Sequence, residues 1–298
     1  MTPAISLTGL TRSYRGQLAL DDVTFDIDGA SITGLLGRNG AGKTTLMRII
    51  GALEFASTGQ VRVFGASPVE NDAVLRRIVL VREDQTYPEL RVRYLLRVAS
   101  WFYPNWSSEL AERLVADFDI PLNRRVRNLS RGMRSELGIV IGLASRAEVT
   151  LFDEPYAGLD AVARQLFYDR LLADFAEHPR TVLVSTHLID EVADLLERVL
   201  VIDRGRIVLD ANADSLRGAA TTVSGSAAAV TEFVEGRTTW DRRRAGSQES
   251  VIVSGALDDR DRAEAQRLNL NLAPVSLQQL VAHLPSGATA SPKEEHRA

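Results

Sequence analysis

Cysteine is absent from the 298 residues of this chain. Without thiols the protein has no disulfide scaffold, no zinc ribbon, no cysteine-held iron–sulfur cluster and no thiol nucleophile. An excess of basic residues is also missing, since 35 Lys and Arg stand against 39 Asp and Glu. Proteins that bind nucleic acids usually carry a basic surface, so the composition argues against a nucleic-acid partner.

Long hydrophobic runs are missing as well. The longest apolar stretches, such as 138–144 and 181–184, fall well short of the roughly 20 residues that a membrane-spanning helix needs. The N-terminus lacks the basic segment and apolar core of a signal peptide, so we expect a cytoplasmic protein. Hydrophobic residues make up 45% of the chain, which is enough for a sizeable core in one large domain or two smaller ones.

A glycine-rich segment follows the expected strand 32–36 and precedes an expected helix over 43–52. Residues 37–44 read GRNGAGKT and match the pattern G-x-x-x-x-G-K-[ST] at every position. Such a loop aims successive backbone N–H groups, the helix dipole and the lysine at phosphate oxygens, while the Thr44 hydroxyl is suited to Mg²⁺. The residues expected to hold a nucleotide here are Gly37, Arg38, Asn39, Gly40, Ala41, Gly42, Lys43, Thr44 and Thr45.

Two carboxylates follow an apolar strand at 149–152. The strand brings Asp153 to the carboxyl edge of the sheet, where open α/β folds bind their ligands, and predicts that Asp153 holds Mg²⁺ through its water shell. Strand alternation predicts that Glu154 points to the opposite side, from which it can polarise the water that attacks the γ-phosphate.

The order of the expected elements predicts the fold class. Strand and helix alternate from residue 147 onward, with a helix over 188–197 and a strand at 199–202, which implies a mainly parallel sheet with crossover helices. We therefore expect an α/β fold with a P-loop NTPase core, a helical insert and a small C-terminal α+β unit. The expected boundaries are 1–218 for the ATP-binding domain, with its insert at about 86–145, 219–285 for the accessory unit and 286–298 for a disordered tail.

Further motifs, in order along residues 4–210, resemble those of the ATP-binding subunits of bacterial ABC transporters. Residues 128–134, NLSRGMR, resemble the family's signature loop and retain Ser130 and Gly132. The segment 157–160, AGLD, resembles the D-loop and places Asp160 there. The resemblance further implies that His187 is the switch histidine and that Tyr14 stacks on adenine.

The position of the family's Q-loop glutamine is ambiguous. Counting from the strand at 78–81 puts Glu83 at that position, and Gln85 lies two residues later. A carboxylate at Glu83 can still meet Mg²⁺ or one of its waters. We favour Glu83 and keep Gln85 as the alternative.

The resemblance implies an N-terminal antiparallel β subdomain before the core. It also implies ATP hydrolysis coupled to transport. Two chains, identical or related, would pair head to tail on ATP and Mg²⁺, with Glu154 and His187 positioning the water. The aromatic-rich helical insert would receive a membrane permease, which would hold the protein at the inner face of the cell membrane. The C-terminal unit resembles the accessory segment of export-type ATPases, so we expect an exporter. The alternatives are a soluble ABC-type ATPase acting on ribosomes or DNA, and a nucleotide-dependent regulator.

Overall fold

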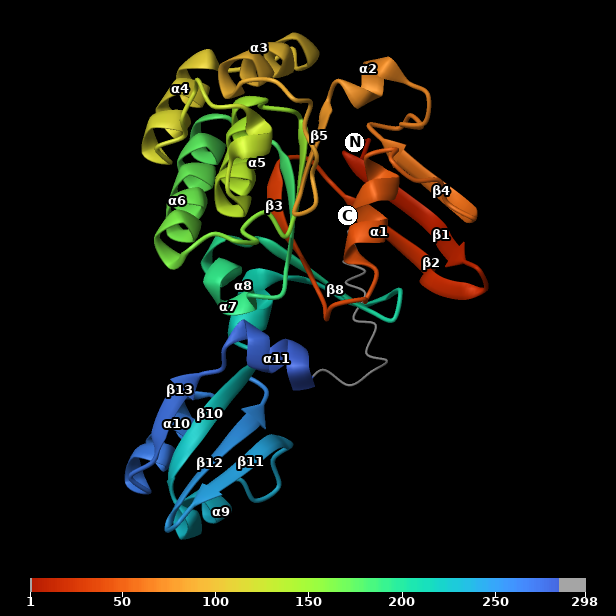
Figure 1. The fold of residues 1–298 in the computed structure, drawn as a ribbon. Helices are drawn as coiled ribbons and strands as arrows, with labels where there is room; N and C mark the ends of the chain where they lie inside the picture. The colour runs from red at the N-terminus through yellow and green to blue at the C-terminus, as the bar shows by residue number, and fades with distance from the viewer. Residues whose placement is uncertain (1, 284–298) are drawn as a thin grey trace. The chain divides into compact units, whose positions relative to one another are not determined.

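The computed structural model describes residues 2–283 of the chain (Figure 1). The chain divides into two compact units: Met1–His187 with Leu200–Ile207, and Leu188–Val199 with the chain from Val208 onward. The expected boundary at residue 218 stays a prediction. The expected tail at 286–298 and the end of the accessory unit at 285 lie outside the described residues.

The first unit begins with a three-stranded antiparallel sheet in the order β2-β1-β4. Its strands are β1 (Ile5–Tyr14), β2 (Gln17–Ile27) and β4 (Thr58–Val63). Apolar residues on alternate positions of these strands share one core with the buried face of α1 (Lys43–Ile50). This sheet confirms the expected N-terminal antiparallel subdomain.

The central sheet has six strands in the order β5-β6-β7-β3-β8-β9. The strands are β3 (Ser31–Leu36), β5 (Ile78–Arg82), β6 (Val149–Asp153), β7 (Thr181–Thr186), β8 (Arg198–Asp203) and β9 (Arg206–Asn212). The neighbours β5-β6, β6-β7 and β7-β3 run parallel. All residues of β6 and β7 are buried, as expected for strands covered on both faces.

Strand β9 is an addition that the sequence analysis did not foresee. Arg204 and Gly205 join it to β8, with φ angles of 45° and 80°. Two consecutive residues with positive φ form the type I′ turn that joins antiparallel strands. The sheet is therefore mixed, with its parallel part confirming the predicted core.

Figure 1 shows four helices on one side of β5, with α2 (Asp72–Leu75) on the other side. The four are α3 (Val92–Phe102), α4 (Ser108–Asp117), α5 (Arg131–Ala144) and α6 (Ala161–Glu177). Helix α5 approaches β5 closely at Gly142, where an added Cβ would lie 2.7 Å from Val81 Cγ2. The helical insert is confirmed.

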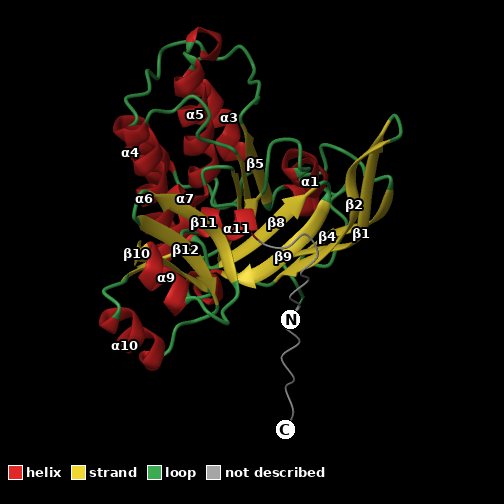
Figure 2. Cartoon of the chain, turned by 90° about the horizontal axis from the view of Figure 1, so that it is seen from below, coloured by secondary structure: helices red, strands yellow, loops and turns green. Residues whose placement is uncertain are grey.

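The second unit contains a four-stranded antiparallel sheet in the order β11-β12-β10-β13. Its elements are β10 (Ala220–Ser226), α9 (Ala227–Phe233), β11 (Thr239–Ala245), β12 (Gln248–Ser254), α10 (Asp259–Arg267) and β13 (Asn271–Pro274). This order and topology are those of the βαββαβ motif. Figure 2 shows β10, β11 and β12 with α9 and α10. Val223 and Val251 pair on one face and pack with Phe233 and Ala265 of the two helices. The predicted α+β unit is thus present, with β13 as an unforeseen edge strand.

The expected helix over 188–197 is wrong in length. The structure has a single turn, α7 (Ile189–Val192), followed by a 3₁₀ turn at Ala193–Leu195. In the same unit, α11 (Leu277–His283) packs against α7 and α8 (Ala213–Arg217). Among residues 2–283, no helix combines the length and the apolar character that crossing a membrane requires.

Candidate functional site

The glycine-rich loop joins β3 to α1, and two of its glycines are required by close backbone contacts. An added Cβ at Gly37 would lie 2.4 Å from the Ile202 carbonyl oxygen. Gly42, which precedes α1, has a φ of 115°, and its Cβ would lie 2.6 Å from the Ala19 carbonyl oxygen. Side chains at either position would displace the loop, so the motif glycines hold the helix N-terminus next to β2 and β8.

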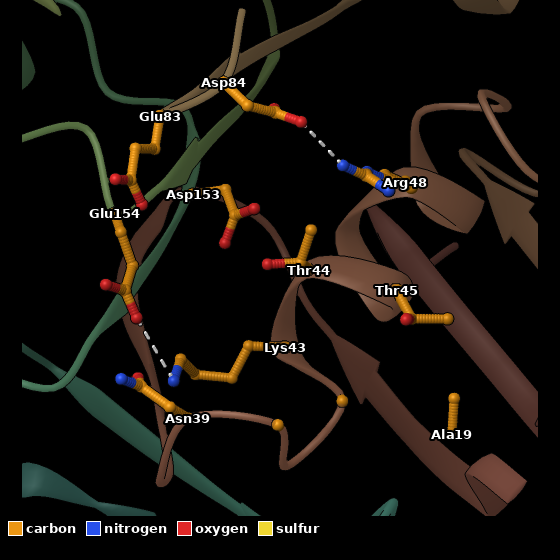
Figure 3. Close-up of a pocket in the computed structure, with 12 residues that line it drawn as sticks. Ala19, Asn39, Lys43, Thr44, Thr45, Arg48, Glu83, Asp84, Asp153 and Glu154 are labelled. Atoms are coloured by element: carbon orange, nitrogen blue, oxygen red, sulfur yellow. Dashed lines mark hydrogen bonds and ion pairs between the residues drawn. The ribbon is translucent and has the colours of Figure 1, made fainter. Parts of the chain in front are cut away.

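Lys43 is buried at the centre of this loop. Its ammonium Nζ donates to the carbonyl oxygens of Gly37 at 2.7 Å and Arg38 at 3.3 Å, and forms an ion pair with Glu154 Oε1 at 3.2 Å (Figure 3). The positive charge is therefore held beside the backbone N–H groups at the start of α1. This arrangement is suited to an anion such as a phosphate.

Asp153 ends β6 as a buried carboxylate beside the loop. Ser185 Oγ donates to its Oδ1 at 2.7 Å, and the Thr44 hydroxyl also bonds to it. Burial raises the pKa of Asp153; hydrogen bonds from Ser185 and Thr44 and the charge of Lys43 oppose this shift, while Glu154 reinforces it. The oxygens of Asp153 and Thr44 thus lie together, as a hard cation would need.

Glu154 does not point away from Asp153, and the prediction from strand alternation is wrong. The strand ends at Asp153, and Glu154 adopts a φ of 46°, which turns the chain there. Its backbone N–H donates to Ser185 Oγ at 3.1 Å, and its Oε2 lies 2.9 Å from His187 Nδ1. Both carboxylates therefore face the same pocket as Lys43 (Figure 3).

Lys43, Thr44, Asp153 and Glu154 line a pocket of about 440 Å³, within the size range of small-molecule sites, and His187 contacts Glu154 from outside this lining. The lining residues are Ala19, Asn39, Gly40, Gly42, Lys43, Thr44, Thr45, Arg48, Glu83, Asp84, Asp153 and Glu154. Sequence reasoning missed Ala19, Arg48 and Asp84. Arg48 lies one turn beyond Thr44 on α1 and pairs with Asp84 at 3.0 Å. Its spacing of four residues from Thr44 on a helix could have indicated that Arg48 lies on the same face. No local pattern indicates its partner Asp84, which lies 36 residues away in sequence.

The two Q-loop candidates differ in their surroundings. Glu83 lines the pocket and forms an ion pair with Arg131 in the first turn of α5. Gln85 is absent from the lining residues, and its Oε1 accepts a hydrogen bond from the Arg82 backbone N–H at 3.2 Å. The side chain of Gln85 thus binds the backbone of the last residue of β5, whereas Glu83 faces the pocket in which a ligand is expected.

The resemblance to ABC ATP-binding subunits implies that ATP hydrolysis is coupled to transport, and we expect the Glu83→Ala variant to weaken this coupling more strongly than Gln85→Ala. Glu83 connects the pocket to α5, so its loss should lower the transport achieved per ATP by roughly fivefold or more, the scale of typical couplings between sites. The measurement is transport per ATP hydrolysed by the assembled transporter. A larger loss in Gln85→Ala would reverse the assignment.

The signature and D-loop residues lie at two helix starts outside the pocket lining. Ser130 Oγ accepts from the Met133 N–H at 3.1 Å and caps α5, and an Asp160 carboxylate oxygen accepts from the Ala163 N–H at 2.8 Å and caps α6. An added Cβ at Gly132 would lie 2.9 Å from the Gly158 carbonyl oxygen, so the two segments touch. Within one chain, Ser130, Gly132 and Asp160 do not line the pocket that contains Lys43.

Tyr14 ends β1 and is 39% exposed. Its hydroxyl donates to the Glu54 carboxylate, and the Arg12 guanidinium lies 4.4 Å from its ring centroid. Tyr14 is not among the residues that line the pocket. Its expected contact with adenine stays a prediction.

Comparison with known proteins identifies the family. A model of the ABC transporter family matches residues 20–157. The chain is 32% identical over 220 residues to the Nod factor export ATP-binding protein I of Rhizobium johnstonii, covering 72% of this chain and 70% of that protein. The chain belongs to the ATP-binding proteins of ABC transporters.

Other relatives agree with this membership. This chain is 30% identical to the ABC transporter ATP-binding protein YtrB of Bacillus subtilis over 196 residues, covering 65% of this chain and 67% of that protein. It is 31% identical to the doxorubicin resistance protein DrrA of Mycobacterium tuberculosis over 223 residues, with coverages of 72% and 67%.

Solved structures agree on the fold. An ATP-binding subunit of an ABC transporter superposes with a TM-score of 0.65 at 26% identity, covering 72% of this chain and 92% of that one. A dimeric bacterial ABC transporter cassette superposes with a TM-score of 0.61 at 23% identity, covering 70% of this chain and 98% of that one, and shows the fold alone.

The ABC ATP-binding protein is therefore the component that binds ATP and energises an ABC transporter, with ATP hydrolysis coupled to transport. Proteins of this family work with membrane permeases. The predicted family, fold class and ATPase activity are confirmed, and the family assignment favours transport over the ribosomal, DNA-associated and regulatory alternatives.

Proposed function

We propose that this ABC ATP-binding protein powers an exporter and works in the cytoplasm, at the inner face of the cell membrane, bound to an integral membrane permease. Relatives named for Nod factor export and doxorubicin resistance support the outward direction. Trp101 and Phe102 on α3 are 70% and 60% exposed, and they offer the permease an apolar contact on the helical insert. The transported compound would bind the permease and not this chain.

The observation that carries the proposed chemistry is that Glu154, a residue of the pocket lining, contacts Lys43 through Oε1 and His187 through Oε2. The loop N–H groups and the Lys43 ammonium bind the β- and γ-phosphates of ATP. Those phosphates compete for the Lys43 charge that Glu154 otherwise holds, which leaves Glu154 available to accept a proton from the attacking water. His187 Nδ1, 2.9 Å from Glu154 Oε2, orients that carboxylate.

The oxygen donors beside the loop fit Mg²⁺. The Thr44 hydroxyl bonds to the Asp153 carboxylate, and Mg²⁺ usually combines one or two protein oxygens with substrate phosphates and water. We assign Thr44 and Asp153 as its protein ligands, with Glu83 facing its water shell. Bound there, Mg²⁺ would neutralise charge on the phosphates during hydrolysis.

A second ATP-binding chain, identical or related, completes each site in this proposal. Ser130 and Gly132 begin α5 outside the pocket of their own chain, and a helix start with free N–H groups is suited to a phosphate presented from outside. Asp160 would lie at the same junction. ATP held between two chains favours the closed dimer, and this change would be passed to the permease.

We expect that deleting this ATP-binding protein raises the intracellular level of the transported compound and lowers its level in the medium. An exporter that stops working retains its substrate inside the cell. Untargeted mass spectrometry of cells and medium measures both levels for every detectable compound at once. Complementation with the parent chain should restore them, and complementation with Glu154→Gln should not. The opposite change, a lower level inside, would indicate an importer.

A further inference from the structure

Tyr156 lies two residues beyond Glu154, in the segment between β6 and α6, and is only 3% exposed. Its hydroxyl donates to Thr186 Oγ1 and accepts a hydrogen bond from the backbone N–H of His187 at 3.3 Å. Thr186 is the fully buried last residue of β7. The Tyr156 hydroxyl thus makes two hydrogen bonds at the end of β7, directly before and at His187. The proposed chemistry of Glu154 and His187 does not itself use this hydroxyl.

The strand pairing itself stops short of the two reacting side chains. The register of β6 and β7 ends at the pair Asp153 and Ser185, one residue before Glu154 and two before His187. Beyond this point two hydroxyls join the chain segments. Ser185 Oγ accepts from the Glu154 N–H at 3.1 Å, and the Tyr156 hydroxyl accepts from the His187 N–H.

The side chain of His187 is only partly packed against its surroundings. It is 48% exposed, and its ring centroid lies 6.1 Å from that of Tyr156. Its Nδ1 nevertheless sits 2.9 Å from Glu154 Oε2. The direction of the Cα–Cβ bond limits where the ring of His187 can reach, and the hydrogen bond from its backbone N–H to Tyr156 holds the backbone from which that bond starts.

We propose that Tyr156 is a positioning residue for ATP hydrolysis, which fixes the backbone of His187 so that its imidazole meets Glu154. This inference rests on the proposed roles of Glu154 and His187. Burial raises the pKa of the Tyr156 phenol, so its hydroxyl stays protonated at neutral pH and keeps both bonds. Phenylalanine would fill the same volume without either bond.

The test is Tyr156→Phe in the full chain, assayed for ATP hydrolysis in steady state and in single turnover. We expect kcat to fall by roughly 10- to 100-fold, the cost of slightly misplaced catalytic groups. The KM for ATP and the Kd of ATP should stay near the parent values, because Lys43 and Thr44 are untouched. Tyr168→Phe is the matched control. Tyr168 is also 3% exposed, and removing its hydroxyl leaves the bond between Tyr156 and His187 in place.

A double-mutant cycle with His187→Ala separates positioning from a general structural effect. The alanine variant keeps the backbone N–H but has no imidazole to position. We therefore expect that adding Tyr156→Phe to His187→Ala changes single-turnover hydrolysis less than twofold, whereas independent effects would multiply. Thermal unfolding of each variant reports any loss of stability.

Two results would overturn the role of Tyr156: parent-like kcat in Tyr156→Phe, or losses that multiply in the double variant. These two results are interpreted only after Glu154→Gln and His187→Ala have each been found to be inactive or strongly impaired in ATP hydrolysis. If those two variants instead hydrolyse ATP at the parent rate, the proposed function of the site fails, and the inference loses its basis for that separate reason.

Discussion

The Glu154→Gln variant is expected to bind ATP and to lose hydrolysis by about 10²- to 10⁴-fold, the usual contribution of a positioned general base. The amide keeps the shape of the side chain beside Lys43 and His187 but cannot accept the proton of the attacking water. It also gives up its charge, which releases Lys43 for the phosphates. ATP affinity should therefore hold or increase, and ATP-closed dimers should accumulate. Turnover assays, equilibrium ATP binding and sedimentation measure these three quantities.

Glu148→Gln is the matched control for this prediction. Glu148 precedes the same strand β6 at its other end, where it pairs with Arg77 at 2.6 Å and is 44% exposed. The same chemical change there should leave turnover unchanged. A Glu154→Gln variant that hydrolyses ATP at the parent rate would show that Glu154 is not the base.

Lys43→Ala and Ser130→Arg are each expected to abolish ATP-driven dimer formation, and their mixture to restore part of it. Lys43 lies inside the pocket of its own chain, whereas Ser130 caps α5 outside that pocket. If the two residues act on one ATP from opposite chains, a mixed dimer pairs an intact Lys43 with an intact Ser130 at one of its two sites. Analytical ultracentrifugation, with Glu154→Gln in both chains to block turnover, measures the dimer.

The controls for the mixing experiment concern folding and exchange. Loss of the Ser130 cap costs about 1 kcal/mol of stability, so thermal unfolding must show that Ser130→Arg is folded. Subunit exchange and ATP binding at the one intact site are measured in the same mixture. A mixture that exchanges subunits and binds ATP without forming dimers would favour a site contained within a single chain.

The loop from Gly37 to Thr44 shows what can be read directly along the chain. Its phosphate-binding groups are consecutive residues between a strand and a helix, so one local pattern specifies both the geometry and the chemistry. The alternation of strands and helices likewise predicted the parallel core, because each parallel pair joined by a crossover helix appears in the sequence as strand, helix, strand. The sequence did not reveal the edge strands β9 and β13, because β9 has a single buried residue and β13 has none, so neither carries a clear apolar pattern.

The sequence by itself thus determined the family, the fold class and the phosphate loop, all of which rest on local spacing. The tertiary structure alone decided how the loop meets its surroundings. The turn at Glu154 brings both carboxylates to one pocket, which strand alternation could not foresee because the strand had already ended. Tyr156 reaches Thr186 and His187 across about thirty residues of chain. Such contacts depend on which strands lie side by side, and a linear pattern records only neighbours in sequence.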